Sequence, residues 1–495
     1  MPIQINQEQI TVLNPASLDE VGRIDLSNKL DVDNALKTAS EYKEWSSLSL
    51  NKRCHLINQF RKAVFKNSDS IKKIIKNETG KKDFVVFIEF LSFLDHAKTM
   101  SKLARTKLKK DKRKTGFLFK NKKAYVQYEP MGVVGIISPW NFPLATAMKG
   151  VIEGLLAGNN IILKPSEFTP LTIEIIKKIW DDSIGYNEAL QVVYGSGDVG
   201  AMLVESPLTD VICFTGSTEV GVKIAEICSK TLKPCVLELG GKDPMIILKD
   251  APLKRSLESA LFAGLFNSGQ TCISTEEVYV EEDLMEEFVS KLSDRIKEVK
   301  SGSDESDDLG PIITPETKKK IEEHLDEVKD SCDVYSGINS DTKKYISPTI
   351  VVNPPDSARI VNEETFGPVI SIRSFKNDDE LIDKIHKTGY GLSSSIFGKD
   401  KKRINSIIKR MKTGNVNIND AMTSYAIPSL PYGGEGMSGL GKQHGVEGLR
   451  SYCRVKSIVE NRFNFIDEPM WLGRPKFVES FLEKGSEWLL PNGLF

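Results

Sequence analysis

The chain has 495 residues, which is enough for two or three domains and a large buried core. Apolar residues make up 40% and charged residues 27%, as in ordinary globular proteins, and the net charge of −1 excludes a global field favouring nucleic acid. The first fifteen residues, MPIQINQEQITVLNP, lack the basic and apolar regions of a secretory signal, and no run of about 18 apolar residues occurs. We therefore expect a cytoplasmic protein.

Cysteine and histidine usage argues against cross-links and metal sites. The seven cysteines are odd in number and form no C-x-x-C pair, which argues against a disulfide framework and indicates a reducing compartment. The histidines show no metal-ligand spacing, so we expect no metal. They are His55, His96, His324, His386 and His444.

Residues 30–110 are predicted to be mainly helical, because charged and apolar residues interleave there at helix-like spacing. The basic stretch KLKKDKRK (107–114) has two interpretations, a nucleic-acid-binding arm or a solvated helix end. No aromatic residues interleave with these lysines, and the chain as a whole is not basic. The solvated helix end is therefore favoured, and we expect no nucleic-acid partner.

From residue 132 onward, short apolar runs alternate with helical patterns such as LTIEIIKKIW (171–180). The runs are GVVGIIS (132–138), NIILK (160–164), LQVVYG (190–195), DVICFTG (210–216) and KPCVLELG (233–240). Such alternation is typical of a parallel sheet with helices on both faces. Ligands of these sheets bind at the carboxyl ends of the strands, where Asn141, Lys164, Gly216 and Glu238 are expected to lie.

A second αβ alternation begins near PMIILK (244–249) and continues through GNVNIN (414–419). Its expected strands include EVYVEE (277–282) and PVISIRSF (368–375). This pattern predicts a second domain that carries Cys272 on a loop. The acidic stretch SGSDESDD (301–308) is interpreted as a surface loop.

Two segments carry residue types suited to catalysis. FNSGQTCIS (266–274) places Cys272 after a Gly-Gln-Thr turn. A single cysteine is more often a small buried hydrophobic residue, but a loop on a rigid scaffold favours a functional thiol. VLELGGKDP (236–244) ends a strand with Glu238. Burying this carboxylate is costly unless it titrates or takes part in chemistry; the alternative is a strand-end glutamate that reaches solvent.

Two further segments suit a nucleotide. FTGSTEVG (214–221) is neither G-x-G-x-x-G nor a P-loop, but Gly216 and Ser217 before a helix can hold a phosphate. KPSEFTP (164–170) would place Lys164 and Glu167 near a strand end, where a ribose can bind. The alternatives are an ordinary turn for the first segment and a helix cap at Ser166 for the second.

Taken together, these segments resemble the aldehyde dehydrogenase superfamily. The matching motifs are SPWNFP (138–143), KPSE (164–167), FTGSTEVG (214–221), LELGGK (237–242), GQTC (269–272), EETFGPV (363–369) and PYGGEGMSGLG (431–441). They follow that family's order and spacing to about residue 460. The resemblance implies oxidation of an aldehyde to a carboxylic acid with NAD, and NADP is the less favoured cofactor.

The resemblance also implies roles for individual residues. Cys272 corresponds to the nucleophile that forms a thiohemiacetal and then a thioester once hydride has passed to the nicotinamide. Asn141, with the backbone N–H of Cys272, corresponds to the oxyanion hole, and Glu238 to the base that activates the thiol and the hydrolytic water. The residues corresponding to the cofactor site are Lys164 and Glu167 for the adenine ribose, Gly216 and Ser217 for the pyrophosphate, Glu364 and Phe366 for the nicotinamide ribose and ring, and Trp140 as a wall.

The architecture implied by the resemblance is α/β. A Rossmann-type nucleotide-binding domain is expected at 1–110 and 131–240, and an α/β catalytic domain at 241–430. Residues 111–130 and 450–462 are expected to form a β oligomerisation arm, which implies a homodimer or a homotetramer. Residues 463–495 are a C-terminal extension that matches no family motif.

Departures from the family pattern leave the substrate open. Tyr432 and Gly436 replace the more usual Phe and Lys, and the loop at 419–431 resembles the fatty-aldehyde branch of the superfamily. The positions that match the family's substrate tunnel include no arginine, so we expect an apolar aliphatic or aromatic aldehyde. Lys149, about one helical turn after Thr146, is the one nearby cation that could instead bind a substrate carboxylate. The tunnel positions are Phe142, Thr146, Thr271, Ile273, Met422, Tyr425 and Tyr432.

There are three alternatives to this interpretation. A CoA-acylating member of the superfamily typically lacks the base found here as Glu238, and a non-catalytic protein with the same fold would not need Cys272 or Asn141. The apolar C-terminal extension has three interpretations: packing against its own or a partner subunit, a lid over the substrate tunnel, or attachment to a membrane surface. Packing is favoured.

Overall fold

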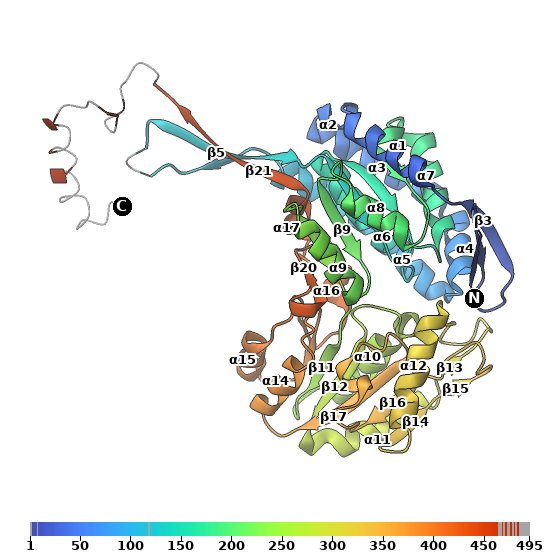
Figure 1. The fold of residues 1–495 in the computed structure, drawn as a ribbon. Helices are drawn as coiled ribbons and strands as arrows, with labels where there is room; N and C mark the ends of the chain where they lie inside the picture. The colour runs from blue at the N-terminus through green and yellow to red at the C-terminus, as the bar shows by residue number, and fades with distance from the viewer. Residues whose placement is uncertain are drawn as a thin grey trace.

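The computed structural model describes residues 2–6, 8–116 and 119–463, together with residues 468, 471, 472, 476, 477, 480, 483 and 484. Two α/β lobes lie one above the other in Figure 1, and a narrow three-stranded sheet extends sideways from the upper lobe. The predictions for the C-terminal extension concern residues that lie largely outside the described ones.

The chain begins with a small antiparallel sheet and five helices. They are β1 (Ile3–Ile5), β2 (Gln9–Leu13), β3 (Glu20–Asp25), α1 (Lys29–Glu41), α2 (Glu44–Ser47), α3 (Leu50–Lys66), α4 (Ser68–Thr79) and α5 (Asp83–Lys107). The helices confirm the helical prediction for 30–110. The N-terminal sheet was not predicted, because strands of three to six residues give too short a pattern.

A six-stranded sheet forms the centre of the upper lobe, in the order β20-β10-β9-β6-β7-β8. Its strands and helices are β6 (Val133–Ile137), α6 (Ala145–Ala157), β7 (Asn160–Lys164), α7 (Pro170–Ile184), β8 (Leu190–Val192), α8 (Gly197–Glu205), β9 (Val211–Thr215), α9 (Thr218–Ser229), β10 (Cys235–Glu238) and β20 (Gly439–Leu440). All pairs are parallel except β10 with β20, a strand from much later in the chain. The five predicted strands and the Rossmann-type fold are confirmed.

The lower lobe contains a seven-stranded sheet in the order β14-β16-β17-β12-β11-β18-β19. Its elements are β11 (Asp243–Ile247), α10 (Leu253–Leu265), β12 (Thr275–Glu281), α11 (Met285–Ile296), α12 (Pro315–Val328), β14 (Asp333–Ser336), β16 (Thr349–Val352), α13 (Arg359–Asn362), β17 (Val369–Phe375), α14 (Asp378–His386), β18 (Ser395–Phe397), α15 (Lys401–Arg410), β19 (Asn417–Ile418) and α16 (Thr423–Ala426). Strands β11, β12, β17 and β19 confirm the second αβ alternation.

The narrow sheet consists of β4 (Asp111–Arg113), β5 (Lys122–Pro130) and β21 (Cys453–Asn461). β5 lies in the middle and pairs with β21 over nine residues, from Cys453 opposite Pro130 to Asn461 opposite Lys122. Both long strands extend away from the lobes (Figure 1). β21 connects back to the upper lobe through α17 (Gly445–Ser451). Across the described residues, no helix is long and apolar enough to cross a membrane.

Candidate active site

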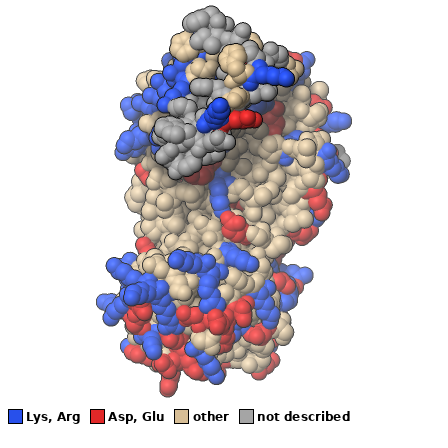
Figure 2. All heavy atoms as spheres, turned by 90° about the vertical axis from the view of Figure 1, so that its left-hand side faces the viewer, with Lys and Arg blue, Asp and Glu red and all other residues tan. Residues whose placement is uncertain are grey.

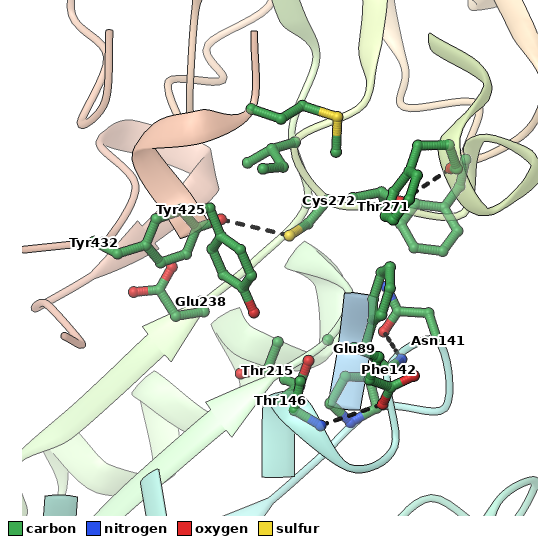
Figure 3. Close-up of a pocket in the computed structure, with 18 of the residues that line it drawn as sticks. Glu89, Asn141, Phe142, Thr146, Thr215, Glu238, Thr271, Cys272, Tyr425 and Tyr432 are labelled. Atoms are coloured by element: carbon green, nitrogen blue, oxygen red, sulfur yellow. Dashed lines mark hydrogen bonds between the residues drawn. The ribbon is translucent and has the colours of Figure 1, made fainter. Parts of the chain in front are cut away.

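A pocket of about 460 Å³ lies where the two lobes meet, at the carboxyl ends of β6, β9 and β10. Eight of the ten predicted site residues line it: Trp140, Asn141, Gly216, Ser217, Glu238, Cys272, Glu364 and Phe366. All seven positions expected for the substrate tunnel line it as well. Figure 3 shows Asn141, Glu238 and Cys272 reaching this space from three different parts of the chain.

The loop before β12 holds Cys272 in a fixed position. Its preceding turn has left-handed backbone at Asn267, Ser268 and Gly269, with φ of 55°, 56° and 72°. A Cβ at Gly269 would lie 1.9 Å from a carbonyl oxygen of Gly367, so only glycine fits. The Gln270 side chain donates to the carbonyls of Asn267 and Pro311 and accepts from the N–H of Ile313. The nucleophile candidate therefore sits on a constrained turn.

Cys272 is a protonated thiol in this environment. Its Sγ lies 3.4 Å from the Tyr432 hydroxyl (Figure 3). Burial raises the pKa of the Cys272 thiol to about 12, and the Tyr432 hydroxyl opposes that rise only in part. A thiol of this kind needs a base before it can attack a carbonyl.

Alkylation of Cys272 should therefore depend strongly on pH. Below its raised pKa the thiolate fraction grows about tenfold per pH unit, so the iodoacetamide reaction should accelerate by roughly a thousandfold from pH 7 to pH 10. Peptide-resolved mass spectrometry of the enzyme without added cofactor measures the rate at this one cysteine. A rate that levels off near pH 8 would mean that the thiolate already exists at neutral pH.

Asn141 follows β6 and lies against the cysteine loop. Its side-chain amide donates to the Gln270 carbonyl at 3.1 Å, and the Asn267 amide donates to the same carbonyl at 3.1 Å. Asn267 also donates to the backbone carbonyl of Asn141 at 3.3 Å. These contacts hold the Asn141 amide on the same side of the pocket as Cys272 (Figure 3).

Glu238 ends β10 and is 4% exposed. Neither carboxylate oxygen has a hydrogen-bond partner among the described residues. Burial raises the pKa of this carboxyl well above its usual range; Lys442 and Lys149 oppose the rise, and Glu153 adds to it. A buried carboxyl without partners, in a pocket that also contains a thiol, is suited to proton transfer. The alternative of a strand-end glutamate that reaches solvent does not match this burial.

The pocket lining also includes residues suited to the phosphate and nicotinamide-ribose parts of a dinucleotide. Gly216 and Ser217 line it at the N-terminus of the twelve-residue α9, where Ser217 accepts from the N–H of Val220. The first N–H groups of a helix favour an anion such as a pyrophosphate. Glu364 accepts from the N–H of Gly241 at 2.9 Å, and burial raises its pKa to about 7. Its remaining oxygen can accept from a hydroxyl group.

A buried ion pair fixes the turn at Phe366. Lys242 and Glu276 lie 2.7 Å apart and are almost fully buried. Glu276 also accepts from the N–H groups of Thr365 and Phe366, which holds Phe366 at φ 57°. The Phe366 ring meets Trp140 edge to face, with ring centroids 5.6 Å apart. The two rings form an aromatic wall of the pocket.

Lys164 and Glu167 do not line this pocket. Lys164 is 4% exposed and lies at the end of β7, with its Nζ 3.4 Å from the Glu167 carboxylate. The two side chains therefore lie near the strand end, as predicted, and they pair with each other there, which was not predicted. Their role toward a ribose stays a prediction.

Several residues at the site were missed by sequence reasoning. Glu89 lines the pocket, pairs with the buried Lys81 at 2.7 Å, and accepts from the N–H groups of Leu144 and Ala145 at the start of α6. The signal was a glutamate inside the apolar run VVFIEFL (85–91). Glu153, inside GVIEGLL (150–156), carries the same signal.

A cluster of buried ionisable groups lies behind Tyr425 and Tyr432. His96 lies 3.2 Å from the Glu153 carboxylate, and the His444 backbone N–H donates to the same carboxylate at 3.0 Å. The Lys149 Nζ lies 3.3 Å from the ring centroid of Tyr425, and burial lowers its pKa to about 7. Lys149 thus meets the pocket through an aromatic ring.

Comparison with known proteins gives the family. The model described as "Aldehyde dehydrogenase family" matches residues 3–458. The chain is 31% identical to D-glyceraldehyde dehydrogenase (NADP(+)) of Picrophilus torridus, over 91% of this chain and 92% of the relative. It is 30% identical to betaine aldehyde dehydrogenase of Bacillus subtilis, over 93% and 96%. The crystal structure of Staphylococcus aureus betaine aldehyde dehydrogenase in complex with NAD+ aligns with a TM-score of 0.87, at 28% identity, over 95% of this chain and 94% of that chain.

These likenesses extend over almost the whole described chain and include both lobes and the pocket between them. The matched proteins are named as aldehyde dehydrogenases, which are oxidoreductases that act on aldehydes. The chain belongs to the aldehyde dehydrogenase family.

Proposed function

We propose that this protein oxidises an apolar aldehyde to its carboxylic acid with NAD, through a thioester on Cys272. The observation that carries the proposal is the convergence of a thiol, an amide and an unpartnered carboxyl on one pocket. Within the family, Cys272, Asn141 and Glu238 stand in the motifs that carry these roles. The carboxyl is the feature that distinguishes hydrolysis by water from transfer to CoA.

The first half of the proposed reaction forms the thioester. Glu238 takes the proton of the Cys272 thiol, through water where the two groups are not in contact, and the sulfur attacks the aldehyde carbon. The Asn141 amide and the Cys272 N–H stabilise the resulting oxyanion, a contribution of about 3–4 kcal/mol per donor in other enzymes. NAD, when bound, supplies the hydride acceptor that turns this thiohemiacetal into a thioester.

The second half releases the acid. Glu238 first releases to solvent the proton it took from the thiol. It then takes a proton from a water molecule, which attacks the thioester carbon and displaces the Cys272 sulfur as a thiolate. Because the base must be ionised and burial raises its pKa, this step should become faster as pH rises through that raised pKa. The same oxyanion donors serve both halves.

We expect Glu167 to give a preference for NAD over NADP. A carboxylate accepts hydrogen bonds from both ribose hydroxyls but repels a 2′-phosphate. The Glu167→Ser variant should raise the ratio of kcat/KM with NADP to kcat/KM with NAD by roughly tenfold or more. Repulsion between one carboxylate and a 2′-phosphate is of about this size. Comparable kcat/KM values of the wild-type enzyme with both cofactors would refute the preference.

The pocket also predicts the substrate class. Its walls include Phe142, Phe266 and Tyr425, and no described arginine lines it. A substrate carboxylate would require a bidentate partner of that kind. Hexanal should therefore exceed succinic semialdehyde in kcat/KM by at least about tenfold. The reverse order would show that a lysine acts on the substrate carboxylate, either Lys320 in the pocket lining or Lys149 behind the Tyr425 ring.

The narrow sheet suggests how subunits assemble. β21 lies at its edge and exposes Val455 and Val459, which are 59% and 67% exposed. A long edge strand with exposed valines can pair with a strand of a second copy. A homodimer or homotetramer is therefore proposed.

The seven cysteines are all unpaired thiols, which fits a cytoplasmic enzyme.

A further inference from the structure

The outward face of α5 is apolar beside the pocket. Phe84, Phe87 and Leu91 are 59%, 46% and 42% exposed. Their spacing of three and four residues places them on one face of the helix. Ile88 and Ser92, next to this face, line the pocket. Large apolar side chains gathered on a surface in this way indicate an interaction site.

The same face becomes basic toward the end of the helix. One exposed acidic residue, Asp95, lies between Leu91 and Lys98 on this face. Lys98, Lys102 and Arg105 follow at helical spacing and are exposed. Residues 102–123, which continue into β4 and β5, contain eleven lysines and arginines and a single aspartate, although the whole chain has a net charge of −1. Figure 2, which faces the narrow sheet, shows Lys and Arg side chains along the left of the upper part, where few Asp and Glu are seen, and over the lower part, where Asp and Glu lie among them.

Much of this positive charge is not neutralised within the described chain. Arg113 pairs with Asp111 at 2.7 Å, and Lys123 pairs with Glu460 at 2.9 Å. Other exposed lysines of this surface have no ion pair to a described residue, and they include Lys98, Lys102, Lys109 and Lys112. Their charge therefore faces solvent.

We propose that the outward face of α5 and the basic segment after it form a docking surface for an anionic lipid bilayer. Lysines near an anionic leaflet gain electrostatic attraction, and aromatic side chains enter the interfacial region. Apolar and basic residues are segregated along α5, whereas binding of single-stranded nucleic acid needs aromatic side chains interleaved with cations. The arrangement thus fits a bilayer better than a nucleic acid.

Docking would bring the pocket close to the lipid. Ser92, which lines the pocket, and Lys107, at the basic end of the same helix, are fifteen residues apart. This separation corresponds to about 22 Å along the helix axis. An apolar aldehyde dissolved in the bilayer would have a short path to the pocket. The docking surface contains none of the reacting groups, so its test is independent of the proposed reaction.

Vesicle co-sedimentation of the full-length protein tests this proposal. The protein should sediment with vesicles of phosphatidylcholine and phosphatidylserine at low salt, and much less with phosphatidylcholine alone. Raising the ionic strength should weaken the binding, because exposed charges are screened. Equal binding to both vesicles, or no binding to either, would overturn the proposal.

Two variants and a matched control locate the surface. The first variant combines four substitutions and should lower vesicle affinity by about a hundredfold or more, at roughly fivefold per lysine. The substitutions are Lys98→Gln, Lys102→Gln, Lys109→Gln and Lys112→Gln. The second variant, Phe84→Ser with Phe87→Ser, should lower vesicle affinity at every salt concentration, because apolar contacts are not screened by ions. The control replaces four exposed lysines elsewhere with Gln and should bind like the wild type. They are Lys29, Lys52, Lys343 and Lys399.

The outcomes separate the candidate partners. Equal losses in the lysine variant and the control would show a general charge effect and would overturn the proposal. Binding of a single-stranded oligonucleotide, without binding to the anionic vesicles, would replace it with a nucleic-acid site. Size-exclusion chromatography and circular dichroism of each variant verify its assembly and folding. A variant that fails them is replaced by the corresponding pairs, Lys98→Gln with Lys102→Gln or Lys109→Gln with Lys112→Gln.

Discussion

Replacing Cys272 with Ala should lower aldehyde oxidation by roughly 10⁴-fold or more, as loss of a nucleophile does in other enzymes that form a covalent intermediate. The alanine removes the only sulfur among the described residues that line the pocket, apart from the thioether of Met422. NAD affinity should change by less than about threefold, because the proposed cofactor residues lie on other loops. Steady-state NADH formation and NAD titration by fluorescence measure the two effects.

Other cysteines provide the matched control for this experiment. Cys228, on α9, and Cys235, on β10, pack in the hydrophobic core of the upper lobe and do not line the pocket. Their alanine variants should keep activity and lose only the packing stability of a small side chain. More than about a hundredth of wild-type activity in the Cys272 variant would assign the nucleophile to another residue.

Replacing Glu238 with Gln should block turnover after the thioester has formed. The amide keeps the size of the side chain but cannot accept a proton, and general bases contribute about 10²–10⁴-fold. Steady-state turnover should fall by at least about a hundredfold, while the first turnover still gives a burst of NADH if solvent can deprotonate the thiol. Stopped-flow absorbance resolves the burst from the steady state.

The pH profile separates a chemical role of Glu238 from a structural one. Wild-type deacylation should rise with pH through the raised pKa of this carboxyl, and the Gln variant should lose that rise. Loss of activity with an unchanged pH profile would indicate a packing defect. Unchanged turnover would mean that the buried carboxyl is not the base for deacylation.

Most of the fold could be predicted because its strands are apolar and separated by helices. Ile161, Ile162 and Leu163 are fully buried in β7, and runs of this kind are strong signals of parallel strands. The N-terminal sheet could not be predicted, because its strands are short and partly exposed. The pairing of β20 with β10 joins residues about 200 positions apart, and no local pattern encodes it.

At the site, sequence motifs predicted the residues that converge but not the contacts around them. The Tyr432 hydroxyl contacts the Cys272 sulfur, although the two residues are 160 positions apart in the sequence. No local sequence pattern predicts this contact. Glu89 and Glu153 were visible as acidic residues in apolar runs, yet their partners lie on other elements. Lys164 and Glu167 stand at the end of β7, apart from the pocket lining, and only the three-dimensional structure shows that separation.

If Cys272 carries the acyl group, mass spectrometry of the trapped intermediate should detect it there. The Glu238→Gln variant is mixed with hexanal and NAD, quenched in acid and digested. We expect the mass of a hexanoyl group on the peptide that contains Cys272, and no such adduct when NAD is omitted. An acyl group on a different residue, or acid formation without any adduct, would show that Cys272 does not carry the acyl group.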